Sequence, residues 1–206
     1  MASLFITFEG VEGCGKSTQS RRLYRRLQKL AIPALLIHEP GITALGNKIT
    51  RLLKWAKDIN ISPLSELMLF NASRAQLVTD VIEPALAEGK MVVCDRYADS
   101  TTAYQGYGRG LYLAVVTEVN HIATKGLVPD LTILLDVPAE KGLRRKKDET
   151  PDRFHIEKLD FHRRVREGFL KLAKAEPERW LVIDGTQSEE KIAGIIWEKV
   201  TELIRT

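Results

Sequence analysis

The chain has 206 residues, of which 44% are hydrophobic and 28% charged, and its formal net charge is +4. This length suits one α/β domain with a single core, and the composition is ordinary for a globular protein. Two cysteines, Cys14 and Cys94, exclude a disulfide framework and indicate a reducing compartment. No apolar run approaches the about 20 residues that span a bilayer, and the first residues do not read as a signal peptide. We therefore expect a cytoplasmic protein without a membrane partner.

Short β-branched apolar runs alternate with longer segments of helical period, which predicts a parallel sheet covered by helices. The five predicted strands are 4–8, 34–37, 91–94, 131–135 and 180–183. Apolar side chains at helical spacing lie between them, in particular Leu23, Leu27 and Leu30, then Leu67, Leu77, Val81 and Leu86. After the last strand, a final amphipathic helix is marked by Ile192, Ile195, Ile196, Val200 and Leu203. The charged segment 144–155, interrupted by Pro151, is predicted to be a flap. No repeat or linker divides the chain, so we predict one domain over 1–206.

A phosphate-binding motif follows the first predicted strand. Residues 10–17 read GVEGCGKS and match G-x-x-x-x-G-K-[ST] between a strand and a helix. The glycines let backbone N–H groups surround the α- and β-phosphates, and the positive end of the helix faces them. Lys16 is predicted to reach the β- and γ-phosphates, and the Ser17 hydroxyl to coordinate Mg²⁺. The predicted ATP-binding residues are Gly10, Val11, Glu12, Gly13, Cys14, Gly15, Lys16, Ser17 and Thr18.

Asp95 and Arg96 stand at the end of the third predicted strand, where ligands bind in an open α/β sheet. Asp95 could hold Mg²⁺ or orient an acceptor, and Arg96 could grip a phosphate. Taken alone, the dipeptide is equally compatible with structural ion pairs. The phosphate loop alone does not separate a kinase from a GTPase, a motor or a clamp loader.

The longer stretch DRYADSTTAYQG, residues 95–106, resembles the thymidylate kinase family, whose run is D-R-[YF]-x-x-S-x-x-A-Y-Q. The resemblance extends to FEGVEGCGKST at 8–18, HEPGIT at 38–43, Phe70 with Arg74, and DRF at 152–154. It implies a thymidylate kinase of the bacterial type with the P-loop nucleoside monophosphate kinase fold. In this α/β fold helices surround a five-stranded parallel sheet, and a basic flap (LID) is added to it. It also implies ATP-dependent, Mg²⁺-assisted phosphorylation of dTMP to dTDP for dTTP synthesis, a homodimer, and no nucleic-acid partner.

The resemblance assigns roles to individual residues. Phe70 is similar to the ring that stacks on thymine, Arg74 to the donor to O4, and Glu12 to the acid that binds the 3′-hydroxyl. Arg51 and Arg96 resemble the clamp on the acceptor phosphate. Tyr104 and Gln105 would cover the sugar and the base. Tyr104 would also crowd a 2′-hydroxyl on the sugar. The implied substrate-binding residues are Glu12, Glu39, Pro40, Arg51, Phe70, Arg74, Arg96, Ser100, Tyr104 and Gln105.

Two positions depart from the family pattern. His38 replaces a common arginine and is interpreted as a strand-end side chain, and Ile42 replaces a glycine. Because a β-branched residue resists positive φ, the loop after Gly41 is expected to run differently. The resemblance also implies a cis peptide between Glu39 and Pro40.

The catalytic cations are the last expectation. Some family members carry an arginine in the phosphate loop after the acidic residue, where this chain has Gly13. The resemblance therefore implies an arginine finger from the flap, with Arg144, Arg145 and Arg153 as catalytic candidates beside Lys16, Asp95 and Arg96. The flap charges could instead only steer nucleotides.

Three alternatives remain beside a dTMP kinase: a kinase for another nucleoside monophosphate or nucleoside, a non-catalytic nucleotide-sensing module, and a DNA-dependent ATPase. A sensor could have lost Asp95 or the flap arginines, which are present here. A DNA-dependent ATPase would need a second basic surface with interleaved aromatic residues, which the sequence does not suggest.

Overall fold

The computed structural model describes residues 3–56, 59–146 and 153–205. Five parallel strands form one sheet in the order β2-β3-β1-β4-β5. They are β1 (Phe5–Glu9), β2 (Ala34–His38), β3 (Met91–Asp95), β4 (Leu131–Asp136) and β5 (Trp180–Asp184). All predicted strands are confirmed, and each ends one residue later than predicted. The added residue is polar in every case, so apolar content alone did not include it.

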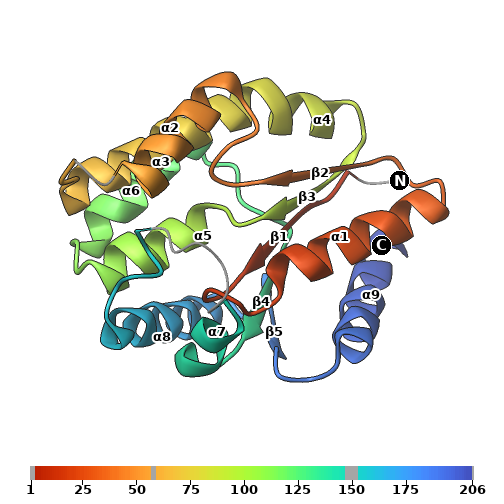
Figure 1. Ribbon diagram of the computed structural model, residues 1–206. Helices are drawn as coiled ribbons and strands as arrows, with labels where there is room; N and C mark the ends of the chain where they lie inside the picture. Colours follow the sequence, from red (N-terminus) through yellow and green to blue (C-terminus); the bar gives the residue numbers. More distant parts are fainter. Residues whose placement is uncertain (1–2, 57–58, 147–152, 206) are drawn as a thin grey trace.

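Helices occupy the connections between the strands. They are α1 (Lys16–Lys29), α2 (Ala44–Trp55), α3 (Pro63–Leu77), α4 (Glu83–Ala87), α5 (Ala98–Thr101), α6 (Leu113–Thr124), α7 (Ala139–Arg145), α8 (Leu159–Ala175) and α9 (Glu189–Arg205), with π-helical segments η1 (Val78–Ile82) and η2 (Thr102–Gly108). Figure 1 shows α1 and α9 on one side of the sheet and α2, α3, α4 and α6 on the other. The fold class is therefore confirmed as a helix-covered parallel α/β sheet.

Strand β1 lies at the centre of the sheet and is buried along its whole length. Its successive side chains point to opposite faces, so Ile6 and Phe8 join the core that includes α1 and α9. Phe5 faces the other way, into the core formed with η1 and α4. Glu9 ends this second face as a fully buried carboxylate at the edge where the strands terminate.

The strand register gathers three loops at one edge of the sheet. Phe8 pairs with Asp95, and Asp95 in turn pairs with His38. Three loops therefore lie side by side: the phosphate loop after β1, the loop after β2, and the loop after β3 at residues 96–97, which we call the acceptor loop. Within the described ranges, no helix is both long and apolar enough to cross a membrane. Cys14 and Cys94 are buried and free.

Candidate active site

The phosphate loop joins β1 to α1 and crosses directly over α7. Gly13 adopts φ 68°, and a Cβ atom there would overlap the carbonyl oxygen of Gly142. Gly142 is similarly tight, because its own Cβ would overlap the carbonyl oxygen of Glu12. This pair of glycines lets the two backbones touch, and it explains why residue 13 has no side chain.

Lys16, Ser17 and Asp95 lie together at the start of α1. The Lys16 ammonium is 6% exposed and donates to the carbonyl oxygens of Gly10 and Val11, both at 2.9 Å. The Ser17 hydroxyl donates to Asp95 Oδ2. A hydroxyl and a carboxylate are the hard oxygen ligands that suit Mg²⁺, which takes its remaining ligands from phosphates and water. The described residues contain no cluster of three or more acidic, histidine or cysteine side chains that could hold a metal.

Two cavities adjoin at this edge of the sheet. One follows the phosphate loop and is lined by Glu12, Gly13, Gly15, Lys16, Ser17, Thr18, Arg21, His38, Glu39, Lys54, Asp95, Arg96, Arg145 and Lys146. The other lies behind the acceptor loop and is lined by Glu12, Glu39, Pro40, Lys54, Phe70, Arg74, Arg96, Tyr97, Ser100, Thr101, Tyr104, Gln105 and Phe154. Glu12, Glu39, Lys54 and Arg96 line both cavities. The boundary between the two cavities is therefore formed by two acidic and two basic side chains.

Arg96 stands at this junction in an unusual backbone conformation. Its φ is 74°, which costs about 1–3 kcal/mol for a residue other than glycine. The guanidinium pairs with Glu12 and donates to Ser100 Oγ at 3.2 Å and to Tyr104 Oη at 3.3 Å. Although burial alone would raise the pKa of Glu12, the charges of Arg96 and Lys16 hold it well below its ordinary value. Glu12 is therefore an ionised acceptor, able to bind a sugar hydroxyl.

The inner end of the acceptor cavity is aromatic. Phe70 is half-buried, and its ring centroid lies 5.8 Å from that of Phe154. Tyr104 is 6% exposed and packs edge-on against Phe154, Phe161 and Phe169. Sequence reasoning placed Phe154 only within a family motif. The structure makes it a wall of the cavity opposite the predicted stacking ring.

Arg74 lies at the bottom of the same cavity and is 1% exposed. Its Nε donates to Glu39, Nη1 to Asn71 and Asn120, and Nη2 to Tyr97 O and Thr101 Oγ1. An arginine has five N–H donors, so each one is engaged. Donation to a base would require the exchange of one of these bonds.

The loop after β2 confirms one expectation and overturns another. The Glu39–Pro40 peptide is cis, as the resemblance implies. The expectation that Ile42 would avoid positive φ is wrong, because its φ is 70°. Ile42 is the central residue of a γ-turn closed by Thr43 N–H and Gly41 O at 2.9 Å, and its side chain is 39% exposed. His38 ends β2 as expected, and it also lines the phosphate cavity.

The predicted clamp is only partly assembled. Arg51 is exposed on α2 and is not among the described residues that line either cavity. Lys54, almost one helical turn later, lines both of them. Sequence reasoning missed Lys54, although its position three residues after Arg51 on one helix face was a usable signal.

The three candidate flap arginines go to different places, and residues 147–152 of the flap lie outside the described residues. Arg144 is exposed on α7 and is not among the described lining residues. Arg145 lines the phosphate cavity and donates to Gly13 O at 3.2 Å. Arg153 instead donates to Glu66 Oε2 at 3.1 Å, a fully buried carboxylate that also accepts from Gln105 and Arg109. Only Arg145 of the three therefore lies beside the phosphate loop.

A phosphate loop whose cavity opens onto a second, partly aromatic cavity is the arrangement of P-loop kinases that act on small molecules. The family model described as thymidylate kinase matches residues 8–196. Thymidylate kinase of Dehalococcoides mccartyi is 57% identical over 203 residues, covering 98% of each chain. That of Deinococcus radiodurans is 48% identical over 200 residues, covering 97% of each. The crystal structure of thymidylate kinase from Ehrlichia chaffeensis has a TM-score of 0.80 and 34% identity, covering 98% of this chain and 100% of that one. The chain belongs to the thymidylate kinase family.

Proposed function

We propose that the protein transfers the γ-phosphoryl group of ATP to dTMP, giving ADP and dTDP. The observation that carries this proposal is the pair of adjoining cavities, which share Arg96 and Glu12 at their boundary. One cavity has the phosphate loop, and the other has an aromatic end of the kind that accepts a base. Family membership supports thymine as that base.

The reaction needs positioning and neutralisation of charge more than covalent chemistry. An oxygen of the dTMP phosphate would attack the γ-phosphorus as the bond to the ADP oxygen breaks, so no phosphoenzyme forms. Arg96 would hold the acceptor phosphate, and Lys16 would leave its loop carbonyls for the β- and γ-phosphates. Ser17 and Asp95 would hold Mg²⁺, which neutralises the charge of the phosphates when bound.

Base selection tests this function directly. If Phe70 stacks on the base and Arg74 exchanges one of its bonds to donate to O4, a cytosine instead turns its own amine toward the guanidinium and leaves that amine without an acceptor. An unmatched donor costs about 1–3 kcal/mol, so kcat/KM should be at least about tenfold higher for dTMP and dUMP than for dCMP. A coupled ADP-release assay across the nucleoside monophosphates measures this. Equal values for dCMP and dTMP would refute the assignment of Arg74, and preference for a purine would indicate a different monophosphate kinase.

Sugar selection tests the role of Tyr104. Because its ring is packed between aromatic neighbours while its hydroxyl lies 3.3 Å from Glu12 Oε1, we expect the ring to exclude a 2′-hydroxyl. Tyr104→Phe should retain the preference for deoxyribose, whereas Tyr104→Ala should weaken it by about tenfold. The measurement is the ratio of kcat/KM values for the deoxyribose and ribose forms of the substrate. An unchanged ratio in Tyr104→Ala would assign the discrimination to another residue.

The assembly and location follow from the same reasoning. We propose a homodimer, because α3 and α6 pack together and expose large apolar side chains, namely Leu64, Met68, Leu113, Val115 and Ile122. A pairing of these faces would remove apolar surface from water.

We propose the cytoplasm as the location of the protein, in keeping with free thiols at Cys14 and Cys94. ATP and dTMP would be its partners, without nucleic acid.

A further inference from the structure

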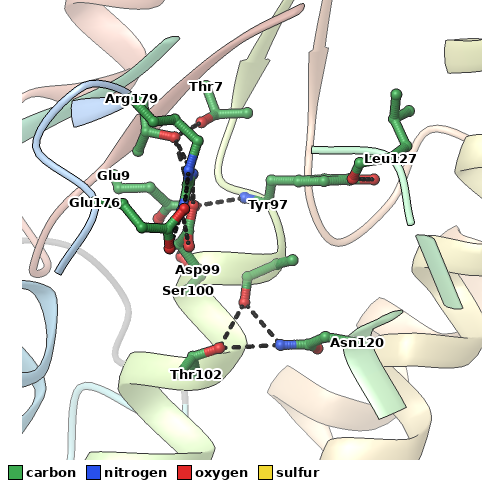
Figure 2. Close-up of polar contacts among 12 residues, drawn as sticks. Thr7, Glu9, Tyr97, Asp99, Ser100, Thr102, Asn120, Leu127, Glu176 and Arg179 are labelled. Carbon is green, nitrogen blue, oxygen red and sulfur yellow. Dashed lines mark hydrogen bonds and ion pairs between the residues drawn. The ribbon is translucent and has the colours of Figure 1, made fainter. Parts of the chain in front are cut away.

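Glu9 is a buried carboxylate that none of the roles above uses. It ends β1, directly before the phosphate loop, and is 0% exposed. Its Oε1 accepts from the backbone N–H of Tyr97 at 2.7 Å, and its Oε2 accepts from the Ser100 hydroxyl at 2.5 Å. Figure 2 shows Glu9 beside Tyr97, Asp99 and Ser100. A carboxylate in such a place is costly to bury, so a role beyond space-filling is required.

Both contacts of Glu9 connect it to Arg96, one through the backbone and one through a side chain. The bond to Tyr97 N–H fixes the peptide that follows Arg96, whose φ is 74°. Ser100 connects Glu9 to the guanidinium, because Arg96 Nη1 donates to the same hydroxyl at 3.2 Å. An ionised carboxylate can only accept, so the single proton of Ser100 is directed to Glu9. The lone pairs of Ser100 then face Arg96.

The other acid of this turn has a cationic partner of its own. Asp99 forms a two-fold pair with Arg179, with Nη1 to Oδ2 at 2.7 Å and Nη2 to Oδ1 at 3.0 Å. Arg179 also pairs with Glu176 and donates to Thr132 Oγ1, so its guanidinium serves several acceptors around Asp99 (Figure 2). The Glu9 carboxylate, by contrast, has Tyr97 N–H and the Ser100 hydroxyl as its hydrogen-bond partners among the described residues, and both belong to the segment that follows β3.

We propose that Glu9 is a positioning residue for phosphoryl transfer, which holds the Arg96 side chain and backbone in the geometry that grips the acceptor phosphate. This inference rests on the proposed function and deepens it. Glu9 would not touch the substrate. It acts through Ser100 and through the peptide that follows Arg96.

Glu9→Gln separates positioning from a structural role. The amide oxygen can still accept from Tyr97, but the amide nitrogen must donate to Ser100, which turns the hydroxyl proton toward Arg96. At pH 8 we expect kcat/KM for dTMP to fall at least about tenfold, because a small displacement of a phosphate clamp is costly to rate. The dissociation constant of ATP should stay within about twofold. The midpoint of thermal unfolding should be unchanged or higher, since the buried charge is removed.

Two further variants make the test decisive. Ser100→Ala, at a half-buried position, should lower kcat/KM in the same direction, and the double variant should lose less than the product of the single losses. Thr7→Val is the matched control, because Thr7 is also fully buried on β1 and bonds to Thr132 Oγ1 at 3.0 Å. It should alter the unfolding midpoint and leave kcat/KM unchanged.

Three results would overturn the proposal: kcat/KM of Glu9→Gln within about twofold of wild type, a loss that only parallels a fall in the unfolding midpoint, or independent effects of Glu9 and Ser100. Failure of the proposed function is a separate result, because it is read from the wild-type enzyme alone. If the wild type prefers another monophosphate, the same variants are compared with that acceptor.

Discussion

Replacing Arg145 with alanine is expected to lower kcat by about 10³-fold or more, the range in which an arginine finger contributes to phosphoryl transfer. Gly13 brings no side chain to the phosphate loop, so a second cation must come from elsewhere. Among the three flap candidates, Arg145 alone lies in the phosphate cavity, where it is held at the carbonyl oxygens of Gly13 and Gly185. A guanidinium there could turn toward the charge that develops on the transferred group.

The matched controls are the neighbouring arginines. Arg144→Ala should keep kcat within about tenfold, because its side chain is not among the described residues that line the phosphate cavity, and so should Arg153→Ala, whose side chain is directed to Glu66. Steady-state kinetics with saturating ATP separates kcat from KM, and added guanidinium ion should partly restore Arg145→Ala. If kcat of Arg145→Ala stays within about tenfold while only KM moves, the residue merely steers nucleotides or braces the loop.

The second large effect concerns stability and pH. Burial raises the pKa of Glu9 from the ordinary value of 4.5 to about 7, and the negative charge of Asp99 adds to this, while Ser100 and Arg96 act in the opposite direction. Between these two values the folded protein binds a proton that the unfolded chain has released. Folding stability from this group is therefore complete below pH 4.5 and is lost as the pH rises through 7, by about 3 kcal/mol.

Glu9→Gln cannot ionise and serves as the reference. The unfolding free energy of wild type minus that of Glu9→Gln should fall by about 3 kcal/mol between pH 4.5 and 8, measured by urea unfolding at each pH. The subtraction cancels groups common to both proteins, such as Glu12. A difference that does not vary with pH would show that Glu9 has an ordinary pKa in the folded protein.

Local patterns in the sequence predicted the sheet and the phosphate loop. The strands are short apolar runs with both faces buried, and the loop combines glycines and Lys16 at fixed spacing, so neither depends on distant residues. The junction of Lys16, Ser17 and Asp95 was also predictable, because parallel strands end at one edge of a sheet.

The remaining features depend on contacts that spacing does not reveal. The direction of Arg153 is set by Glu66, a residue 87 positions away in the chain. The five bonds of Arg74 come from several separate segments, so its lack of a spare donor was not visible in a motif. Ile42 accepts positive φ because the next residue closes a γ-turn, a local override of an intrinsic preference.

The contact between Gly13 and Gly142 restricts how this enzyme could change over evolutionary time. An arginine at position 13 would push against α7, the helix that ends at Arg145. A lineage could therefore not acquire a cation in the loop while keeping the existing one as a reserve. An arginine introduced at position 13 while Arg145 is still present would disturb α7. Loss of Arg145 before that change would leave the negative charge of the phosphates without this cation. If Arg145 supplies the catalytic cation, the two ways of supplying it would be separated by poorly active intermediates, and each lineage should retain the one it inherited.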